Sequence, residues 1–223
     1  MKAKAHRQMG DLPKYAEQAA RIQENLARKL VIADDFDEVS LVAGLDAAYP
    51  EDGPARAAAA VLTYPGLEFV EGAVVEAHAP FPYLPGLFCF REGPLVLDAL
   101  DSLAAKPHLL LADGHGIAHP RRMGLAAWVG LKAALPCIGV AKTSLAGLDA
   151  NPGEGRGEHE PLEIDGSIVG YVLRTQTGVH PVYVSPGYRV SPRTALEFAL
   201  DCSPGFRIPE PIRRAHALAG GGA

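Results

Sequence analysis

The sequence lacks the features that mark secreted, membrane and disulfide-rich proteins. Its three cysteines are odd in number and sit among apolar residues, so we expect buried thiols in a reducing compartment. No apolar run approaches the roughly 18 residues that a membrane-spanning helix needs, and the N-terminal stretch has no apolar segment typical of a secretion signal. We therefore expect a cytoplasmic protein that makes no membrane contact.

Two classes of binding site also find little support. The spacing of His and Cys that structural zinc requires is absent. Gly114-His115-Gly116 lacks the further glycine of a dinucleotide fingerprint, so a nucleotide-binding module is a weak alternative. A net charge of −5 argues against a protein that simply coats nucleic acid, although five arginines against three acids in residues 186–223 leave room for a basic patch.

Length and composition predict one domain over residues 1–223. With 48% hydrophobic residues, the chain has ample material for a core. Apolar residues at three- and four-residue steps, among them Tyr15, Ala19 and Ile22, predict an amphipathic helix over about residues 11–30 that packs on the core. A flexible tail is expected over about residues 219–223.

The next segments predict an antiparallel meander. Residues 39–48, 57–64 and 67–78 are rich in β-forming side chains and are separated by proline and glycine. Asp46 lies inside the first of these runs, where an unpaired buried acid is costly. It therefore either alternates outward to solvent or is held by a metal or another cation.

Residues 109–142 predict a strand, a helix and a second strand. The apolar run 109–112 fits a strand buried on both faces and ends at Asp113. His119 precedes Pro120, which suits a first helical turn, and the run 137–141 ends at Lys142. These polar residues fall at strand ends, where open α/β sheets bind ligands, although a lone Asp there is also a common cap or turn former.

The loop at residues 80–86, PFPYLPG, is stiffened by three prolines. It presents Phe81 and Tyr83, which suit either insertion between bases or packing onto the domain. Glu92 follows at or just before a helix start, since Pro94 fits a first turn. A carboxylate is favoured at that position by the helix dipole alone, so the position by itself does not require a functional role.

The last third predicts a hairpin, a strand and two helices. They are expected at residues 162–165 with 168–175, 182–185, 191–199 and 212–218, the final helix being basic and carrying His216. Asp46, Glu92 and Asp113 then converge at one end of a sheet. Carboxylates of this kind hold Mg²⁺ together with water and phosphate, as in phosphodiester cleavage.

At these residues the chain resembles the endonuclease V family, nucleases that act at deaminated purines. The resemblance covers about residues 12–218. It rests on VAGLDAAYP around Asp46, FPYLPGLFCFREGPL around Tyr83 and Glu92, DGHGIAHPRRMGLA around Asp113 and His119, IGVAK ending at Lys142, and GYVLRT with PVYVSPGYRVS. It implies an α/β, ribonuclease H-like fold, with a mixed central sheet that begins with a three-strand antiparallel meander and is flanked by helices.

The resemblance implies a role for each motif residue. Asp46, Glu92 and Asp113 are then the metal-binding acids, with Mg²⁺ as the ion and Mn²⁺ as a substitute. His119 and Lys142 complete the catalytic centre. We assign His119 to the attacking water and Lys142 to the scissile phosphate.

The resemblance also implies substrate-binding residues. Tyr83 matches a wedge that separates the strands, while Gly86, Phe88 and Gly114 match positions around the extruded base. His216 matches a C-terminal histidine near the site, though a surface histidine is an equal alternative. Two departures stand out. Trp128, on an inward helical face, replaces the histidine common in the family, and Phe88 replaces a smaller aliphatic residue and is expected to narrow the base pocket.

The activity implied is metal-dependent hydrolysis of the second phosphodiester bond 3′ to hypoxanthine, which leaves a nick. The expected partner is DNA containing deoxyinosine, with inosine-containing RNA as an alternative, and the expected state is a monomer. A rival is another ribonuclease H-like, structure-selective nuclease or ribonuclease, which would not need the PYLP wedge. A non-catalytic nucleic-acid-binding module would be expected to lose at least one of the acids.

Overall fold

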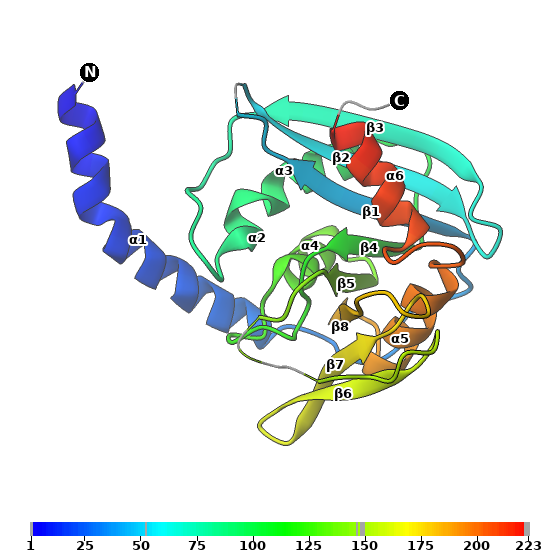
Figure 1. Cartoon of the computed structure of the whole chain (residues 1–223). Coiled ribbons are helices and arrows are strands. Elements are labelled where there is room, and N and C mark those ends of the chain that lie inside the picture. Colours follow the sequence, from blue (N-terminus) through cyan, green and yellow to red (C-terminus); the bar gives the residue numbers. More distant parts are fainter. Residues whose placement is uncertain (1, 52, 146, 148–149, 221–223) are drawn as a thin grey trace.

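The structure is a computed structural model that describes residues 2–51, 53–145, 147 and 150–220, with residues 2–13 described by their backbone alone (Figure 1). Its elements in chain order are α1 Lys2–Ala27, β1 Leu41–Ala48, β2 Ala55–Thr63, β3 Phe69–Ala77, α2 Phe88–Arg91, α3 Gly93–Asp101, β4 Leu109–Asp113, α4 Leu125–Ala133, β5 Cys137–Ala141, β6 His159–Ile164, β7 Ser167–Leu173, β8 Val182–Tyr188, α5 Pro192–Asp201 and α6 Glu210–Ala219. No helix among these residues is both long and apolar enough to cross a membrane.

One mixed sheet of eight strands organises the domain, in the order β3-β2-β1-β4-β5-β8-β7-β6. The first three strands form the predicted antiparallel meander, while β1, β4 and β5 run parallel to one another. The parallel strands are almost wholly apolar because helices cover both of their faces. The predicted ribonuclease H-like fold is confirmed.

Alternation along the strands divides the core into two layers. Ala43 and Leu45 of β1 pack with α3 and α4, whereas Val42 packs with α5 and α6 on the other face. Strand β4 alternates in the same way, so Leu109 and Leu111 share the α5 and α6 face with Val42. Any side chain with this parity at the end of β1 or β4 is therefore directed toward α6.

The first helix differs from its prediction in length and in orientation. It runs from Lys2 to Ala27 and not over 11–30, because good helix formers such as Ala, Lys and Gln extend it before the apolar stripe begins. Tyr15 and Ile22, predicted to face the core, are 53% and 41% exposed. The buried positions are Ala19 and Gln23, so the packing face is rotated and its most buried member is polar.

The helix expected from Pro120 begins later, at Leu125. Residues 114–124 instead cross the end of the sheet as a loop, in which the Arg122 N–H donates to the His119 carbonyl in a turn. The Gly124 N–H donates to the carbonyl of Gly116 in the same crossing. The predicted hairpin is confirmed as β6 and β7, and the predicted strand at 182–185 extends to Tyr188. The expected tail falls largely on residues 221–223, outside the described part.

A glycine lets the last helix reach the sheet. A Cβ on Gly44 of β1 would lie 1.9 Å from the carbonyl oxygen of Pro211, in the first turn of α6. Only a residue without a side chain therefore allows this approach. Figure 1 shows α6, in red, lying directly over the meander.

The substitution Gly44→Ala should therefore push α6 away from β1. We expect a loss of at least about 1–3 kcal/mol in the free energy of unfolding, as for other overpacked cores. Gly205→Ala is the matched control, because a Cβ there meets open space. Its effect should stay within about 0.5 kcal/mol. Urea denaturation of both variants checks this, and equal stabilities would contradict the close approach.

Candidate active site

Asp46 and Asp113 meet because two neighbouring strands run parallel. The register of β1 and β4 pairs Leu45 with Ala112, so the next residue on each strand is an aspartate. Asp46 lies four residues after Val42, and Asp113 lies two residues after Leu111. Val42 and Leu111 both face α6, so the side chains of the two aspartates are directed toward α6 as well. Asp46 is only 8% exposed, so the alternative in which it turns outward to solvent is wrong.

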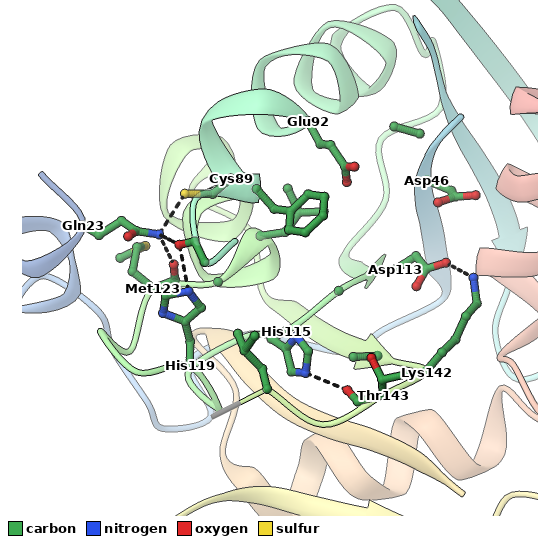
Figure 2. Close-up of a pocket in the computed structure, with 18 of the residues that line it drawn as sticks. Gln23, Asp46, Cys89, Glu92, Asp113, His115, His119, Met123, Lys142 and Thr143 are labelled. Atoms are coloured by element: carbon green, nitrogen blue, oxygen red, sulfur yellow. Dashed lines mark hydrogen bonds and ion pairs between the residues drawn. The ribbon is translucent and has the colours of Figure 1, made fainter. Parts of the chain in front are cut away.

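Glu92 joins the two aspartates from the helical layer. It lies at the junction of α2 and α3, as predicted, but its side chain makes no capping hydrogen bond. Burial, reinforced by the charges of Asp46 and Asp113, raises the pKa of Glu92 to about 8. Burial and then Asp113 also raise the pKa of Asp46. The three carboxyl groups thus share one poorly solvated space, which Figure 2 shows open between them.

Two basic side chains contact these acids. Lys142, at the end of β5, forms an ion pair with Asp113. His216 lies on α6, and its Nδ1 is 2.6 Å from Oδ2 of Asp46. His216 is therefore more than the surface histidine that the sequence left open. The ammonium group of Lys142 compensates part of the negative charge gathered at this end of the sheet, and His216 engages one oxygen of Asp46.

The acids occupy one side of a cavity of about 370 Å³. Its other side, which we call the neutral side, carries no acid. The neutral side is lined by Gln23, Gly86, Phe88, Cys89, His119, Met123 and Leu125. Figure 2 shows Gln23, His119 and Met123 grouped together, away from Asp46 and Lys142, with His115 between the groups. Gly114 also lines the cavity, so all three predicted base-contact residues are at its wall.

His119 belongs to the neutral side in this structure. Its Nδ1 accepts a hydrogen bond from the Arg121 N–H at 3.1 Å, so Nε2 carries the hydrogen and donates to the Gly86 carbonyl at 3.0 Å. Burial, then the charge of Arg121, lowers the pKa of His119 to about 4. The ring is thus neutral, with both nitrogens engaged.

The proline-rich loop presents its aromatic residues differently. Tyr83 is 61% exposed, and its ring contacts that of Phe88 edge-on, with 5.0 Å between centroids. Phe81 packs on Phe90 instead, and its carbonyl accepts a hydrogen bond from Arg91. Of the two predicted alternatives, Phe81 packs onto the domain and anchors the loop, whereas Tyr83 projects from the loop into solvent.

Trp128 is on the inward face of α4, as predicted, and is 8% exposed. A Cβ on Gly93 would lie 2.5 Å from its ring. The indole therefore fills the space that a side chain beside Glu92 would otherwise occupy. Sequence patterns did not reveal this pairing, because Gly93 lies 35 positions away in the chain.

Two further cavity residues, Gln23 and His115, and Arg121, which contacts the cavity wall, went unrecognised in the sequence. Gln23 lies on the buried face of α1, but that face was assigned from the spacing of hydrophobic residues, so a polar residue on it was overlooked. Arg121 is one of two adjacent arginines, and His115 stands in a glycine-rich turn where its ring reaches the Thr143 carbonyl at 3.1 Å. The only available signal was their place within or beside conspicuous motifs.

The donor set suits a hard divalent cation. Among the described residues no three His, Cys, Asp or Glu side chains form a ready-made metal site. Mg²⁺, however, keeps several water ligands and takes others from substrate phosphate, so two or three carboxylates around an open space suffice. Burial and the neighbouring acids raise the pKa values of Glu92 and Asp46, so a further positive charge in this space would favour their ionised forms. A dication would supply that charge.

The mixed sheet with its opening meander, and acids at the ends of adjacent parallel strands, define a ribonuclease H-like nuclease. Comparison with known proteins narrows this class. The family model described as Endonuclease V matches residues 24–217. The chain belongs to the endonuclease V family and is a deoxyribonuclease.

Individual relatives agree along nearly the whole chain. Endonuclease V of Nostoc punctiforme is 44% identical over 93% of this chain and 95% of its own. The crystal structure from Streptomyces avermitilis is 41% identical, with a TM-score of 0.86 over 92% of this chain and 91% of its own. That of Ciona intestinalis, in complex with a 23mer DNA containing an inosine followed by a ribo-adenosine, is 25% identical, with a TM-score of 0.84 over 93% and 96%.

Glu92→Gln should change the pH dependence of stability in the metal-free protein. A carboxyl whose pKa rises from about 4.3 unfolded to about 8 folded favours the native state below pH 4.3, and this advantage is lost as pH rises through 8. The neutral amide escapes that loss. In EDTA we expect similar melting temperatures at pH 4.5 and a higher one for Glu92→Gln at pH 9, by about 2–4 °C per kcal/mol. Parallel curves would contradict the shift.

Proposed function

We propose that this nuclease hydrolyses the second phosphodiester bond on the 3′ side of hypoxanthine in DNA and leaves a nick. The observation that carries the proposal is one cavity with an acidic side and a neutral side, beside the exposed ring of Tyr83. The acids suit phosphodiester hydrolysis and the neutral side suits an extruded base. The inosine-containing DNA held by the Ciona intestinalis relative supports the same substrate.

We propose Mg²⁺ as the ion, with Mn²⁺ as a substitute, in keeping with a metal-dependent family. Asp46, Glu92 and Asp113 would hold it. When bound, the ion supplies Lewis acidity that activates water and stabilises the leaving oxygen. Lys142 lies beside Asp113, so its ammonium group is placed to compensate charge on the scissile phosphate. His216 holds the carboxylate of Asp46 in position.

Two further assignments concern the substrate. Tyr83 serves as the wedge that fills the gap left by the extruded base, with Phe88 supporting its ring. Gly86, Phe88 and Gly114 surround the base. The role of His119 on the attacking water stays a prediction, since its Nε2 would first have to leave the Gly86 carbonyl.

Inosine in RNA is the second candidate substrate. The ribo-adenosine beside inosine in the Ciona intestinalis complex favours testing it, because a ribonucleotide is accommodated there. Labelled duplexes and single strands that contain one deoxyinosine or one inosine, incubated with Mg²⁺ or EDTA, decide between the two. We expect a Mg²⁺-dependent product that ends one nucleotide past the lesion. Cleavage elsewhere, or equal cleavage of undamaged strands, would overturn the proposal.

In the same assay, Asp113→Asn should abolish cleavage yet keep binding. Asparagine has nearly the same shape but lacks the charge that holds a hard cation. Removing that charge also lowers repulsion of the phosphate, so gel-shift affinity for deoxyinosine DNA in Ca²⁺ should be equal or higher. Nicking at the normal rate by the folded variant would refute the metal assignment. Loss of inosine-specific binding would refute the separation of roles.

Tyr83→Ala should weaken cleavage of duplex substrate by about tenfold or more, and that of single strands far less. A stacked base is worth about 1–3 kcal/mol, and a wedge matters only where stacking and pairing must be broken. Tyr15→Ala is the control, because Tyr15 is a comparably exposed tyrosine, 53% accessible, on α1. Equal losses on both substrates would remove the wedge role.

A further inference from the structure

Phe206 is an aromatic residue in the connection between α5 and α6, and it is 51% exposed. One face of its ring is covered by Arg213, whose guanidinium carbon lies 3.3 Å from the ring centroid. This contact holds the ring in place and leaves much of it open to solvent. A single exposed phenylalanine is ordinary on a protein surface, so its meaning depends on what surrounds it.

The residues next to the ring connect it to the acidic side of the cavity. Arg207, the following residue in the chain, donates from Nη2 to the carbonyl of Lys142 at 2.8 Å. Arg213 precedes His216 by three residues on α6, and residues three apart are neighbours on a helix surface. His216 in turn contacts Asp46. The ring of Phe206 is therefore fixed beside the acids from two directions.

The charge around the ring suits a polyanion. Residues 203–216 contain three arginines against one acid, a surplus of two positive charges in a chain whose net charge is −5. The acid, Glu210, forms ion pairs with both Arg213 and Arg214. Its side chain is 14% exposed, whereas that of Arg214 is 55% exposed. The charge that faces solvent beside Phe206 is therefore mainly positive, as binding to a phosphate backbone requires.

The order of the subsites gives the path of the strand. The proposed function places the extruded base on the neutral side and the cut at the acids, in the 3′ direction from that base. Figure 2 shows Gln23 and His119 at one end of the labelled residues, and Asp113 with Lys142 at the other. A strand that continues in this direction passes Lys142, and Arg207 attaches the segment that carries the aromatic ring at that point.

We propose that Phe206 and Arg213 form a stacking platform for an unpaired strand on the 3′ side of the cut. The inference rests on the proposed function, since it extends the path of the same strand. An exposed aromatic ring with cations beside it binds single strands without sequence preference, because any base can stack on the ring while arginines contact the backbone. In a duplex the corresponding bases are already paired and stacked, so they gain nothing from the ring. The platform therefore favours single-stranded substrates.

The first test compares a single strand and a duplex of the same sequence, each with one deoxyinosine. Phe206→Leu keeps an apolar side chain but removes the aromatic face, whereas Phe206→Tyr keeps that face. In Phe206→Leu we expect kcat/KM on the single strand to fall about fivefold or more, mainly through KM, and that on the duplex to fall less. Phe206→Tyr should restore the single-strand value. This preference is the reverse of that expected for Tyr83→Ala.

Phe69→Leu is the matched control for these variants. Phe69 is equally exposed, at 51%, but lies on β3 at the edge of the sheet. Its substitution should leave the ratio of single-strand to duplex cleavage as in the wild type. Melting curves show whether each variant is folded. If Phe206→Leu does not fold, Arg213→Lys takes its place, because lysine keeps the charge but has no planar group to hold the ring, and the same selective fall is expected.

A second measurement identifies the base that stacks. Single strands with one abasic site, placed in turn at each of the first few positions past the cut, keep every phosphate but lack one base. At one position we expect the missing base to lower the wild-type kcat/KM about fivefold or more. Phe206→Leu, already lowered, should lose no more at that position. An equal loss in both proteins, or no loss at any position, would overturn the platform.

The wild-type reactions separate this inference from the function on which it rests. Failure of the wild type to cut either substrate at deoxyinosine overturns the proposed function. Normal cutting by the wild type, together with an equal effect of Phe206→Leu on single strand and duplex, overturns only the stacking platform. A loss confined to the single strand, absent from Phe69→Leu and restored in Phe206→Tyr, supports it.

Discussion

The confinement of like charges at one end of the sheet is the constraint on which the rest of the structure depends. Parallel neighbours β1 and β4 bring Asp46 beside Asp113, and the α2–α3 junction adds Glu92. Burial and mutual repulsion hold the pKa of Glu92 near 8. A buried acid of this kind costs free energy unless a cation pairs with it. Lys142 supplies part of that charge and His216 contacts Asp46, and the remaining negative charge suits the divalent ion proposed above.

Close contacts through glycine set the distances of this centre. Gly44 lets α6 reach β1, which brings His216 to Asp46. Gly93 accommodates the ring of Trp128, so the junction that carries Glu92 rests on an indole. Trp128, where the resemblance led us to expect a histidine, thus has a packing role beside Gly93. Functional and structural requirements are inseparable here, because the surroundings of Asp46 and Glu92 each include a close approach that only glycine allows.

The positions of the acids, the meander and the exposure of Tyr83 on its loop were predictable because each leaves a local signal. These signals are an acid in or at the end of an apolar run, β-forming runs separated by proline and glycine, and prolines around a tyrosine. Three features were not predictable. The start of α4 at Leu125 depends on a loop crossing that no periodicity encodes. The buried face of α1 was predicted wrongly because its most buried residue, Gln23, is polar, and a polar residue in a hydrophobic pattern is assigned to the surface. The burial of Asp46 could not be predicted locally, because its partner, His216 on α6, lies 170 residues further along the chain.

On the neutral side of the cavity, Gln23 of α1 contacts two wall residues that lie 63 and 100 positions away in the chain, Gly86 and Met123. Figure 1 shows α1 running outward from the domain, attached by its C-terminal half and outside the sheet that carries the acids. Undocking of such a helix is a local opening that costs less free energy than global unfolding. In that open state the three acids keep their places on the sheet and at the α2–α3 junction, while the neutral side of the cavity loses Gln23. The docking of the N-terminal helix is therefore the part of the cavity wall that local unfolding can remove while the sheet stays folded.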